Sequence, residues 1–428
     1  MPLPGLVLTG FGALLVLLWA LSSRVVLMGS RKVRILAQVL EEEVQTEQPP
    51  ARTSALTVVV TACNEADQIE NTVRSLLRQR HPRLEIIVVD DRSSDGTGDL
   101  VSKMEAEAPE GVRLRLIRNK TLPDDWTGKC HACHLGATHS TSEWILFTDG
   151  DVRFTDDDLL VRVVNHAEQN GLDHVAVIPD LRPMPAVQAA LVAVFGQMFM
   201  LAARAHEMDL DLRRGGIGVG AFNLVRRRSY DRIGGHQQLK MDLVDDIKLG
   251  RLLKESGARQ RLFNGLGLIR CPWHRGALNV VRGLEKNFFA GLGFSLPLLS
   301  LWTGIVLLLN FGPTGVGVFA SIYFWGSVNP SLLAAAWLPF VVQVVLVAGA
   351  YFVEAPRQGY RALTLTLLHP LSVLLLLAAA WNSALRTLFR GGVQWRGTFY
   401  PLSRLREGLV RRGAGFASTP PERERPGA

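Results

Sequence analysis

The chain lacks charge over three long stretches. Residues 287–353, 362–385 and 6–23 contain no Asp, Glu, Lys or Arg over 67, 24 and 18 positions, respectively. A helix needs roughly 20 apolar residues to cross the hydrocarbon layer of a membrane. The first stretch therefore has room for two or three membrane spans, and each of the others has room for one. This gathering of apolar residues excludes a disordered chain and argues against an ordinary soluble protein.

Cysteine is also scarce. The four cysteines are Cys63, Cys130, Cys133 and Cys271. All four fall in a segment that we expect in the cytoplasm, where thiols stay reduced, so a disulfide framework is excluded. Cys130 and Cys133 belong to "KCHACH", whose C-x-x-C spacing occurs in some zinc sites. The same spacing is typical of one helix face, and the lack of a second Cys/His pair nearby favours the helix.

The first residues, "MPLPG", carry no Lys or Arg, and no cleavage signal follows the apolar run. We therefore predict a transmembrane anchor in residues 1–34 and not a signal peptide. Four basic residues come at its end: Arg24, Arg31, Lys32 and Arg34. Basic flanks face the cytoplasm, which predicts that residues 35–285 lie on that side.

A second basic cluster follows the last apolar run: Arg390, Arg396, Arg404, Arg406, Arg411 and Arg412. The same rule predicts a cytoplasmic tail, so the chain must cross an even number of times after residue 287. Three spans would break this rule, and we expect a fourth short span or a re-entrant segment within 287–330. The net charge of +8 then reflects topology and lipid headgroups, and we expect no nucleic-acid partner.

The middle of the chain alternates apolar runs with helical stretches. Four runs are typical of strands: 55–62, 84–91, 112–118 and 143–152. Helical stretches at 65–80 and 95–108 separate the first three, which predicts βαβ units and a mainly parallel, Rossmann-like sheet in an α/β domain. Ligands bind beyond the carboxyl ends of such strands. The polar residues there are Asn64, Glu65, Asp90, Asp91, Asp149 and Asp151.

The sequence "TDGD" places Asp149 and Asp151 directly after the last of these strands. Side chains two positions apart on extended backbone point the same way. Paired carboxylates suit a hard cation such as Mg²⁺ or Mn²⁺, which would bind together with a diphosphate. An Asp-x-Asp also occurs by chance, and Asp95 and Thr97 nearby fit a helix cap and its turn.

Several short motifs occur in a recognisable order: "TACNE", "VVDDRSSDGT", "DWTGK", "TDGD", "GGH" and "VDDIKLGRLL". This order resembles family 2 glycosyltransferases with a GT-A fold. It is most similar to their membrane-bound branch, which includes hopanoid-associated, carotenoid (diaponeurosporenoate-type) and ceramide glucosyltransferases. The resemblance covers roughly residues 55–290. "VQWRGTFY" (393–400) is similar to the W-K-G-R-x-Y ending of these proteins.

The resemblance implies roles for individual residues. Glu65 and Asp91 would contact the nucleoside, Lys129 would lie near the diphosphate or the sugar, and Asp149 would contact the nucleotide. Asp151 would bind the divalent cation, together with Asp149.

Asp246 would be the general base at the second position of the family's E-D motif. The first position of that motif holds Asp245 here in place of Glu, which keeps the charge. Inverting transfer needs these residue types, because one carboxylate must accept the acceptor's proton and a cation must neutralise the leaving diphosphate. The alternative for both aspartates is a structural role at the N-terminus of an amphipathic helix, where acidic side chains interact favourably with the helix dipole.

Residues 186–205 are apolar except for Arg204. A membrane span here would split the catalytic domain, so we expect an interfacial helix beside the lipid acceptor, with a buried core helix as the alternative.

The predicted organisation is as follows: anchor 1–34, connector 35–54, GT-A domain 55–285, transmembrane region 286–390, and a basic cytoplasmic tail 391–428 with a disordered end. The predicted function is inverting, metal-dependent sugar transfer at the cytoplasmic face of a multi-pass inner (plasma) membrane protein. The donor would be UDP- or GDP-linked, and the acceptor would be the hydroxyl or carboxyl of a carotenoid, hopanoid or similar lipid.

Two alternatives remain open. A processive polysaccharide synthase would carry Q-x-x-R-W after the E-D block, but "NVVRG" keeps only Arg282 of that motif. A non-catalytic membrane scaffold is the other alternative, and the presence of every required carboxylate argues against it.

Overall fold

The computed structural model describes residues 3–44, 53–108, 112–210, 212–273, 276–323 and 330–409. The chain divides into two compact units. We call one the helical unit; it contains Met1–Arg31, Arg182–Ala202 and His274–Arg386. We call the other the α/β unit; it contains Lys32–Leu181, Ala203–Trp273 and Thr387–Ala428. The end of the tail that we predict to be disordered, residues 410–428, lies outside the described residues.

The α/β unit is built on an eight-stranded sheet with the order β3-β2-β1-β4-β7-β6-β8-β5. Its strands are β1 (Leu56–Ala62), β2 (Leu84–Asp91), β3 (Arg113–Asn119), β4 (Trp144–Asp149), β5 (Arg153–Phe154), β6 (His174–Asp180), β7 (Asn223–Arg226) and β8 (Gln260–Arg270). The pairs β3–β2, β2–β1, β1–β4 and β6–β8 are parallel, whereas β7 and β5 pair in the antiparallel sense. The prediction of a mainly parallel α/β sheet is therefore confirmed.

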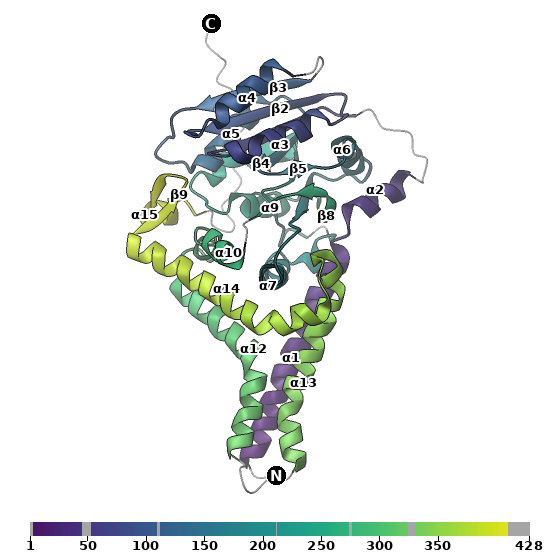
Figure 1. Cartoon of the computed structure of the whole chain (residues 1–428), viewed down its shortest axis with the longest axis vertical. Helices are drawn as coiled ribbons and strands as arrows, with labels where there is room; N and C mark the ends of the chain where they lie inside the picture. The colour runs from purple at the N-terminus through teal and green to yellow at the C-terminus, as the bar shows by residue number, and fades with distance from the viewer. Residues whose placement is uncertain are drawn as a thin grey trace. The chain divides into compact units, whose positions relative to one another are not determined.

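Helices cover both faces of this sheet (Figure 1). The helices of the unit are α2 (Leu36–Val44), α3 (Ala66–Leu77), α4 (Thr97–Ala106), α5 (Gly128–His139), α6 (Leu159–Gln169), η1 (Ala205–Glu207), α8 (Arg227–Arg232), η2 (Gly235–Leu239), α9 (Asp245–Glu255) and α15 (Leu402–Glu407). A separate two-stranded hairpin, β9 (Gly392–Trp395) with β10 (Thr398–Pro401), precedes α15.

The apolar runs of the sequence explain this layered core. All seven residues of β1 are buried, as expected for a strand covered on both faces. Successive side chains point to opposite faces, so Val58 and Val60 join the core beneath α3, α4 and α6, while Val59 joins the core beneath α5 and α9. The neighbouring strands β2 and β4 end in Asp91 and Asp149, and these polar ends carry the candidate site.

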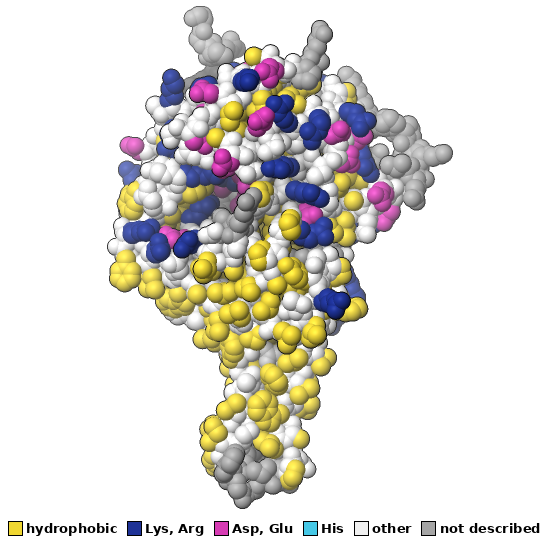
Figure 2. All heavy atoms as spheres, in the orientation of Figure 1, with side chains coloured by type: hydrophobic (Ala, Val, Ile, Leu, Met, Phe, Trp, Pro, Cys, Tyr) yellow, Lys and Arg dark blue, Asp and Glu magenta, His cyan; other side chains and the backbone are white. Residues whose placement is uncertain are grey.

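The helical unit contains four helices that are long and apolar enough to cross a membrane. They are α1 (Leu3–Lys32), α12 (Leu296–Tyr323), α13 (Pro330–Gln358) and α14 (Ala362–Arg390). Shorter helices in this unit are α7 (Ala186–Ala202), α10 (Ala277–Gly283) and α11 (Phe288–Gly291). Figure 2 shows a mostly hydrophobic surface over the long helices, as the uncharged stretches of sequence predict.

Polar contacts hold the long helices together inside this apolar unit. Tyr351 of α13 donates its O–H to His369 Nδ1 of α14 at 2.8 Å, and His369 Nε2–H donates to Asn310 Oδ1 of α12 at 2.9 Å. Trp19 of α1 donates to the Leu309 carbonyl of α12. Such hydrogen bonds fix how helices pack in lipid, where hydrophobicity alone does not select a partner.

The structure differs from one expectation about the spans. After residue 286, the described segments 276–323 and 330–409 contain three long helices and no fourth, and the only short helix within 287–330 is α11. The apolar segment 186–205 forms α7, a 17-residue helix whose residues 188–194 are buried and which contacts α10 and α13. It is shorter than the candidate spans, and its interfacial placement remains a prediction.

Candidate active site

The parallel register brings the predicted acidic residues to one edge of the sheet. Ala62 at the end of β1 pairs with Asp90 of β2, and Thr61 pairs with Asp149 of β4. Glu65 comes three residues after β1 and leads into α3. Three chain segments that lie far apart in the sequence therefore meet at their carboxyl ends.

The "VVDDRSSDGT" motif shapes the loop that carries Glu65. Thr97 Oγ1 accepts the Glu65 backbone N–H at 2.9 Å and donates to Asp95 Oδ1 at 2.6 Å. Asp95 Oδ2 accepts the N–H of Ala66 at 2.9 Å. Asn64 has a left-handed backbone, with φ of 56°, and its Oδ1 accepts the N–H of Ser94. The prediction that Asp95 and Thr97 cap the next helix is wrong, because the N-cap of α4 is Gly96 and no side chain caps it. Asp95 and Thr97 instead bind the loop that leads into α3.

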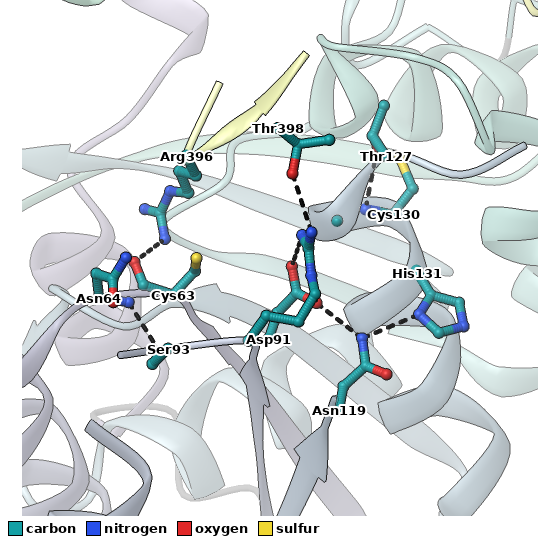
Figure 3. Close-up of polar contacts among 12 residues, drawn as sticks. Cys63, Asn64, Asp91, Ser93, Asn119, Thr127, Cys130, His131, Arg396 and Thr398 are labelled. Atoms are coloured by element: carbon teal, nitrogen blue, oxygen red, sulfur yellow. Dashed lines mark hydrogen bonds and ion pairs between the residues drawn. The ribbon is translucent and has the colours of Figure 1, made fainter. Parts of the chain in front are cut away.

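Asp91 is buried at the end of β2 and is fully partnered. Arg92 binds it through Nε to Oδ1 at 3.0 Å and through Nη2 to Oδ2 at 2.8 Å, and Asn119 Nδ2 donates to Oδ1 at 2.7 Å (Figure 3). Gly128 is pressed against this group, because a Cβ there would lie 2.3 Å from Asp91 Oδ2. The glycine of "DWTGK" is therefore required for α5 to approach β2.

Lys129 forms the basic centre of the site. Thr127 caps α5 by accepting the Cys130 N–H, and this cap places Lys129 in the first turn. Its Nζ lies 2.7 Å from Asp149 Oδ1. Burial disfavours the ammonium ion, but Asp149 and then Asp245 and Asp246 outweigh that effect and hold the pKa of Lys129 well above its usual value. Lys129 therefore stays charged when the site opens to a ligand.

Three carboxylates crowd together beside this lysine. Burial raises the pKa of Asp151, and the nearby charges of Asp149 and then Glu65 raise it further. Burial likewise raises the pKa of Glu65 against the opposing charge of Arg396. A divalent cation would relieve this repulsion, and an all-oxygen set suits Mg²⁺ or Mn²⁺. The residues present therefore fit the predicted cation.

Asp246 is the second residue of α9 and lies beside Lys129 and Asp149. Its Oδ2 accepts the Gly220 N–H at 2.8 Å. A Cβ on Gly220 would lie 2.8 Å from Asp149 Oδ2, 3.0 Å from Lys129 Nζ and 3.2 Å from Asp246 Oδ2. These three side chains therefore converge around one glycine, and a larger residue there would displace their charged ends.

Asp245 and His236 are buried, and both line the small cavity that Asp246 also lines. Asp245 is 3% exposed, and its carboxylate lies within 4.8 Å of ligand atoms of Cys133 and His236. His236 is 1% exposed and its Nδ1 accepts the Tyr230 O–H at 2.8 Å, while burial lowers its pKa to about 3. Cys133, His236 and Asp245 lie close enough together to bind a metal ion. The positive charge of Lys129 beside Cys133 and Asp245 opposes the binding of a cation there.

The sequence "KCHACH" forms a helix face, as the simpler interpretation predicts. Cys130 is buried and its Sγ donates to the Asp242 carbonyl, and Cys133 is buried with it in the core. His134 stacks on Trp126 with ring centroids 5.0 Å apart. The two cysteines and two histidines therefore make separate packing contacts.

A cavity of about 380 Å³, counting the open space at its mouth, lies at this edge of the sheet. Its lining residues are Thr61, Ala62, Cys63, Asp91, Arg92, Gly128, Lys129, Ala132, Asp149, Trp395, Arg396 and Tyr400. Asp246 lines a second, smaller cavity, and Thr61 and Lys129 line both. Sequence reasoning missed Arg92 and the three hairpin residues, although "VQWRGTFY" contained the signal.

Comparisons with known proteins agree with this arrangement. Residues 57–234 match the family profile described as "Glycosyl transferase family 2". These residues form a glycosyltransferase family 2 domain. A curated relative, 4,4'-diaponeurosporenoate glycosyltransferase of Staphylococcus aureus (strain USA300), is 23% identical over 353 residues, 82% of this chain and 89% of the relative. The domain and this relative indicate a glycosyltransferase.

The fold has a counterpart among solved structures. The mannosyltransferase PcManGT from Pyrobaculum calidifontis, solved in complex with GDP-Man and Mn²⁺, aligns with a TM-score of 0.50 and 18% identity. The alignment covers 90% of this chain and 99% of that chain. The likeness supports the GT-A fold that the sequence predicts.

Proposed function

We propose that the chain transfers one sugar, with inversion and with a divalent cation, from a nucleotide-sugar to a lipid acceptor. The observation that carries this proposal is the convergence of Asp149, Lys129 and Asp246 around Gly220. One-step transfer needs two carboxylates to hold the metal ion and a separate carboxylate to accept the acceptor's proton. It also benefits from a permanent positive charge, here Lys129, beside the phosphates.

The chemistry follows from these positions. The acceptor oxygen attacks the anomeric carbon, and the bond from that carbon to the diphosphate oxygen breaks on the opposite face. Asp246 takes the acceptor's proton when the acceptor is a hydroxyl. Lys129, already bound to Asp149, adds positive charge beside the departing diphosphate. Asp149 and Asp151 would hold the cation, which supplies further neutralisation of the leaving group.

Glu65 and Asp91 would bind the nucleoside. Both lie at the carboxyl edge of the sheet beside the cavity, and Asp91 is held rigidly by Arg92 and Asn119. A carboxylate fixed in this way is ready to accept a hydrogen bond from a base or a ribose without losing side-chain entropy on binding.

The acceptor is inferred from the membrane helices and from the relative's name. Four apolar helices indicate a membrane protein, and the relative is named a 4,4'-diaponeurosporenoate glycosyltransferase. We place the α/β unit at the cytoplasmic face of the plasma membrane, because the basic residues flank the helices on that side. A lipid with a free hydroxyl or carboxyl group would then meet the site at the membrane surface.

The test is a transfer assay with the full chain in lipid nanodiscs. Radiolabelled UDP-glucose and GDP-mannose are supplied with Mn²⁺ and either carotenoid or hopanoid acceptors. We expect one of the combinations to yield a lipid carrying a single sugar, with the anomeric configuration opposite to that of the donor, as read by proton NMR. A polymeric product would indicate the processive synthase, and retained configuration would contradict the mechanism.

A further inference from the structure

The hairpin β9–β10 carries an arginine in a backbone conformation that arginine rarely adopts. Trp395 pairs with Thr398, so Arg396 and Gly397 form a two-residue loop. Their φ angles are 46° and 79°, and such a loop favours Asn-Gly or Asp-Gly. Arg396 is therefore held in the left-handed region at some cost, and strained positions of this kind gather at binding sites.

Contacts at the carboxyl edge hold this hairpin in place. Arg396 Nη2 lies 2.5 Å from Glu65 Oε1, and its Nη1 donates to the Cys63 carbonyl at 2.8 Å (Figure 3). Glu65 and Cys63 belong to the loop after β1. The tip of the hairpin is thus fastened to the loop that carries the first predicted donor residue.

Two further bonds tie the hairpin to the other segments of the site. Arg92 Nη1 donates to Thr398 Oγ1 at 2.9 Å, and the Gly128 N–H donates to the Tyr400 O–H oxygen at 3.1 Å. The hairpin therefore contacts the ends of β1 and β2 and the start of α5. Trp395, Arg396 and Tyr400 also line the same cavity as Asp91, Lys129 and Asp149.

From this arrangement we propose that Arg396 binds the diphosphate of the nucleotide-sugar donor, an inference that rests on the proposed function. Its guanidinium is a planar fork that matches phosphate oxygens, and 40% of its side chain is exposed and open to a ligand. All three basic residues of the cavity are paired with a carboxylate, but the side chain of Arg396 is the most exposed, at 40% against 25% for Arg92 and 20% for Lys129. Glu65 holds Arg396 in position until the donor arrives.

This role gives the C-terminal segment a part in donor binding. The hairpin follows directly after α14, the last long helix, with Gly391 between them. The donor site is then completed by Arg396, which lies 331 positions after Glu65. A chain ending before Gly392 would lack this arginine and both aromatic side chains of the cavity.

The test compares nucleotides with nucleosides on the full chain in detergent micelles. Isothermal titration with Mn²⁺ present uses UDP, GDP, uridine and guanosine as probes. We expect the wild type to bind one diphosphate more tightly than the matching nucleoside. Arg396→Ala should weaken binding of that diphosphate roughly 10- to 100-fold, the range for a lost bond to a charged group, and change nucleoside binding little.

Two further variants test whether the guanidinium of Arg396, and not positive charge alone, binds the diphosphate. Arg396→Lys keeps the charge but loses the fork and should fall between wild type and Arg396→Ala. Arg404→Ala removes an exposed arginine of the neighbouring α15 and should bind like the wild type. Unchanged diphosphate affinity in Arg396→Ala, or an equal loss for nucleoside and diphosphate, would overturn this inference alone. A wild type that binds neither diphosphate would overturn the proposed function together with it.

Discussion

The backbone N–H of Gly220 donates to Oδ2 of Asp246 at 2.8 Å, and this bond aims the carboxylate of Asp246 at Lys129 and Asp149. Asp245, one residue earlier, is buried near Cys133 and His236. Adjacent aspartates on the first turn of α9 thus have different surroundings. Both line the smaller cavity, but Asp245 is buried, whereas Asp246 is half-buried and accepts the Gly220 N–H.

We therefore expect Asp246→Asn to lower kcat roughly 10²- to 10⁴-fold, the usual contribution of a general base. The amide keeps the shape of the side chain but cannot accept the acceptor's proton. The KM for the donor should change little, because Asp149, Asp151 and Lys129 remain. Steady-state kinetics on a hydroxyl acceptor would measure both constants.

The neighbouring aspartate provides the control. Asp245→Asn should cost less turnover than Asp246→Asn, because Asp245 is buried. If Asp246→Asn kept more than about half of wild-type turnover with chemistry rate-limiting, the base would have to be another group, and His236 would be tested first.

Removal of the cation should abolish transfer. EDTA should reduce activity to background, and added Mn²⁺ or Mg²⁺ should restore it. Asp151→Ala should also abolish transfer and weaken binding of Mn²⁺ and of the nucleoside diphosphate, because the crowded carboxylates lose one ligand. Electron paramagnetic resonance of bound Mn²⁺ gives a readout that does not depend on turnover.

The matched control is Asp99→Ala, which removes an acid with a 79% exposed side chain on α4. It should retain both Mn²⁺ binding and activity. Full activity after exhaustive chelation would contradict the role of the metal.

The α/β unit should lose stability between about pH 6.5 and pH 4. His174 is buried between Asn223 and Gln260, and burial lowers its pKa to about 4, although the bond to Asn223 opposes that shift. The unfolded chain binds a proton near pH 6.5, so in this window it holds more protons than the folded chain, and stability falls as pH falls. This one group contributes roughly 3 kcal/mol across the window, at about 1.4 kcal/mol per pKa unit.

The comparison is between wild type and His174→Gln, with thermal unfolding in detergent followed by near-UV circular dichroism. The variant should show a shallower fall of Tm with acidification. If the Tm of both proteins fell equally with decreasing pH, His174 would not be buried in its neutral form.

Local sequence patterns predicted four of the eight strands of the sheet, β1 to β4, and the acidic residues that follow them, but not β5 to β8. Strand β2 has the predicted bounds, 84–91, because an uninterrupted apolar run ends in two carboxylates. The contact of Arg396 with Glu65 was beyond such reasoning, since 331 positions separate the two residues and no periodicity links them. The different surroundings of Asp245 and Asp246 were equally hidden, because tertiary packing and not spacing decides which of two adjacent residues is buried.

That same contact between Glu65 and Arg396 constrains the topology. Both residues belong to the α/β unit, so the chain between Trp273 and Thr387 must cross the membrane an even number of times, although it holds three long helices. One of the three cannot be a complete crossing.

Single cysteines should reveal this arrangement in intact cells, because the four native cysteines are buried and give little background. We expect an impermeant thiol reagent to label Tyr323→Cys, at the end of α12, from outside. Lys120→Cys in the α/β unit and Arg404→Cys after the hairpin should react only once the membrane is opened. External labelling of Arg404→Cys with Lys120→Cys still protected would mean an odd number of crossings between these residues and would contradict the topology. External labelling of Lys120→Cys would instead place the α/β unit outside, away from the cytoplasmic nucleotide-sugars that the proposed reaction needs.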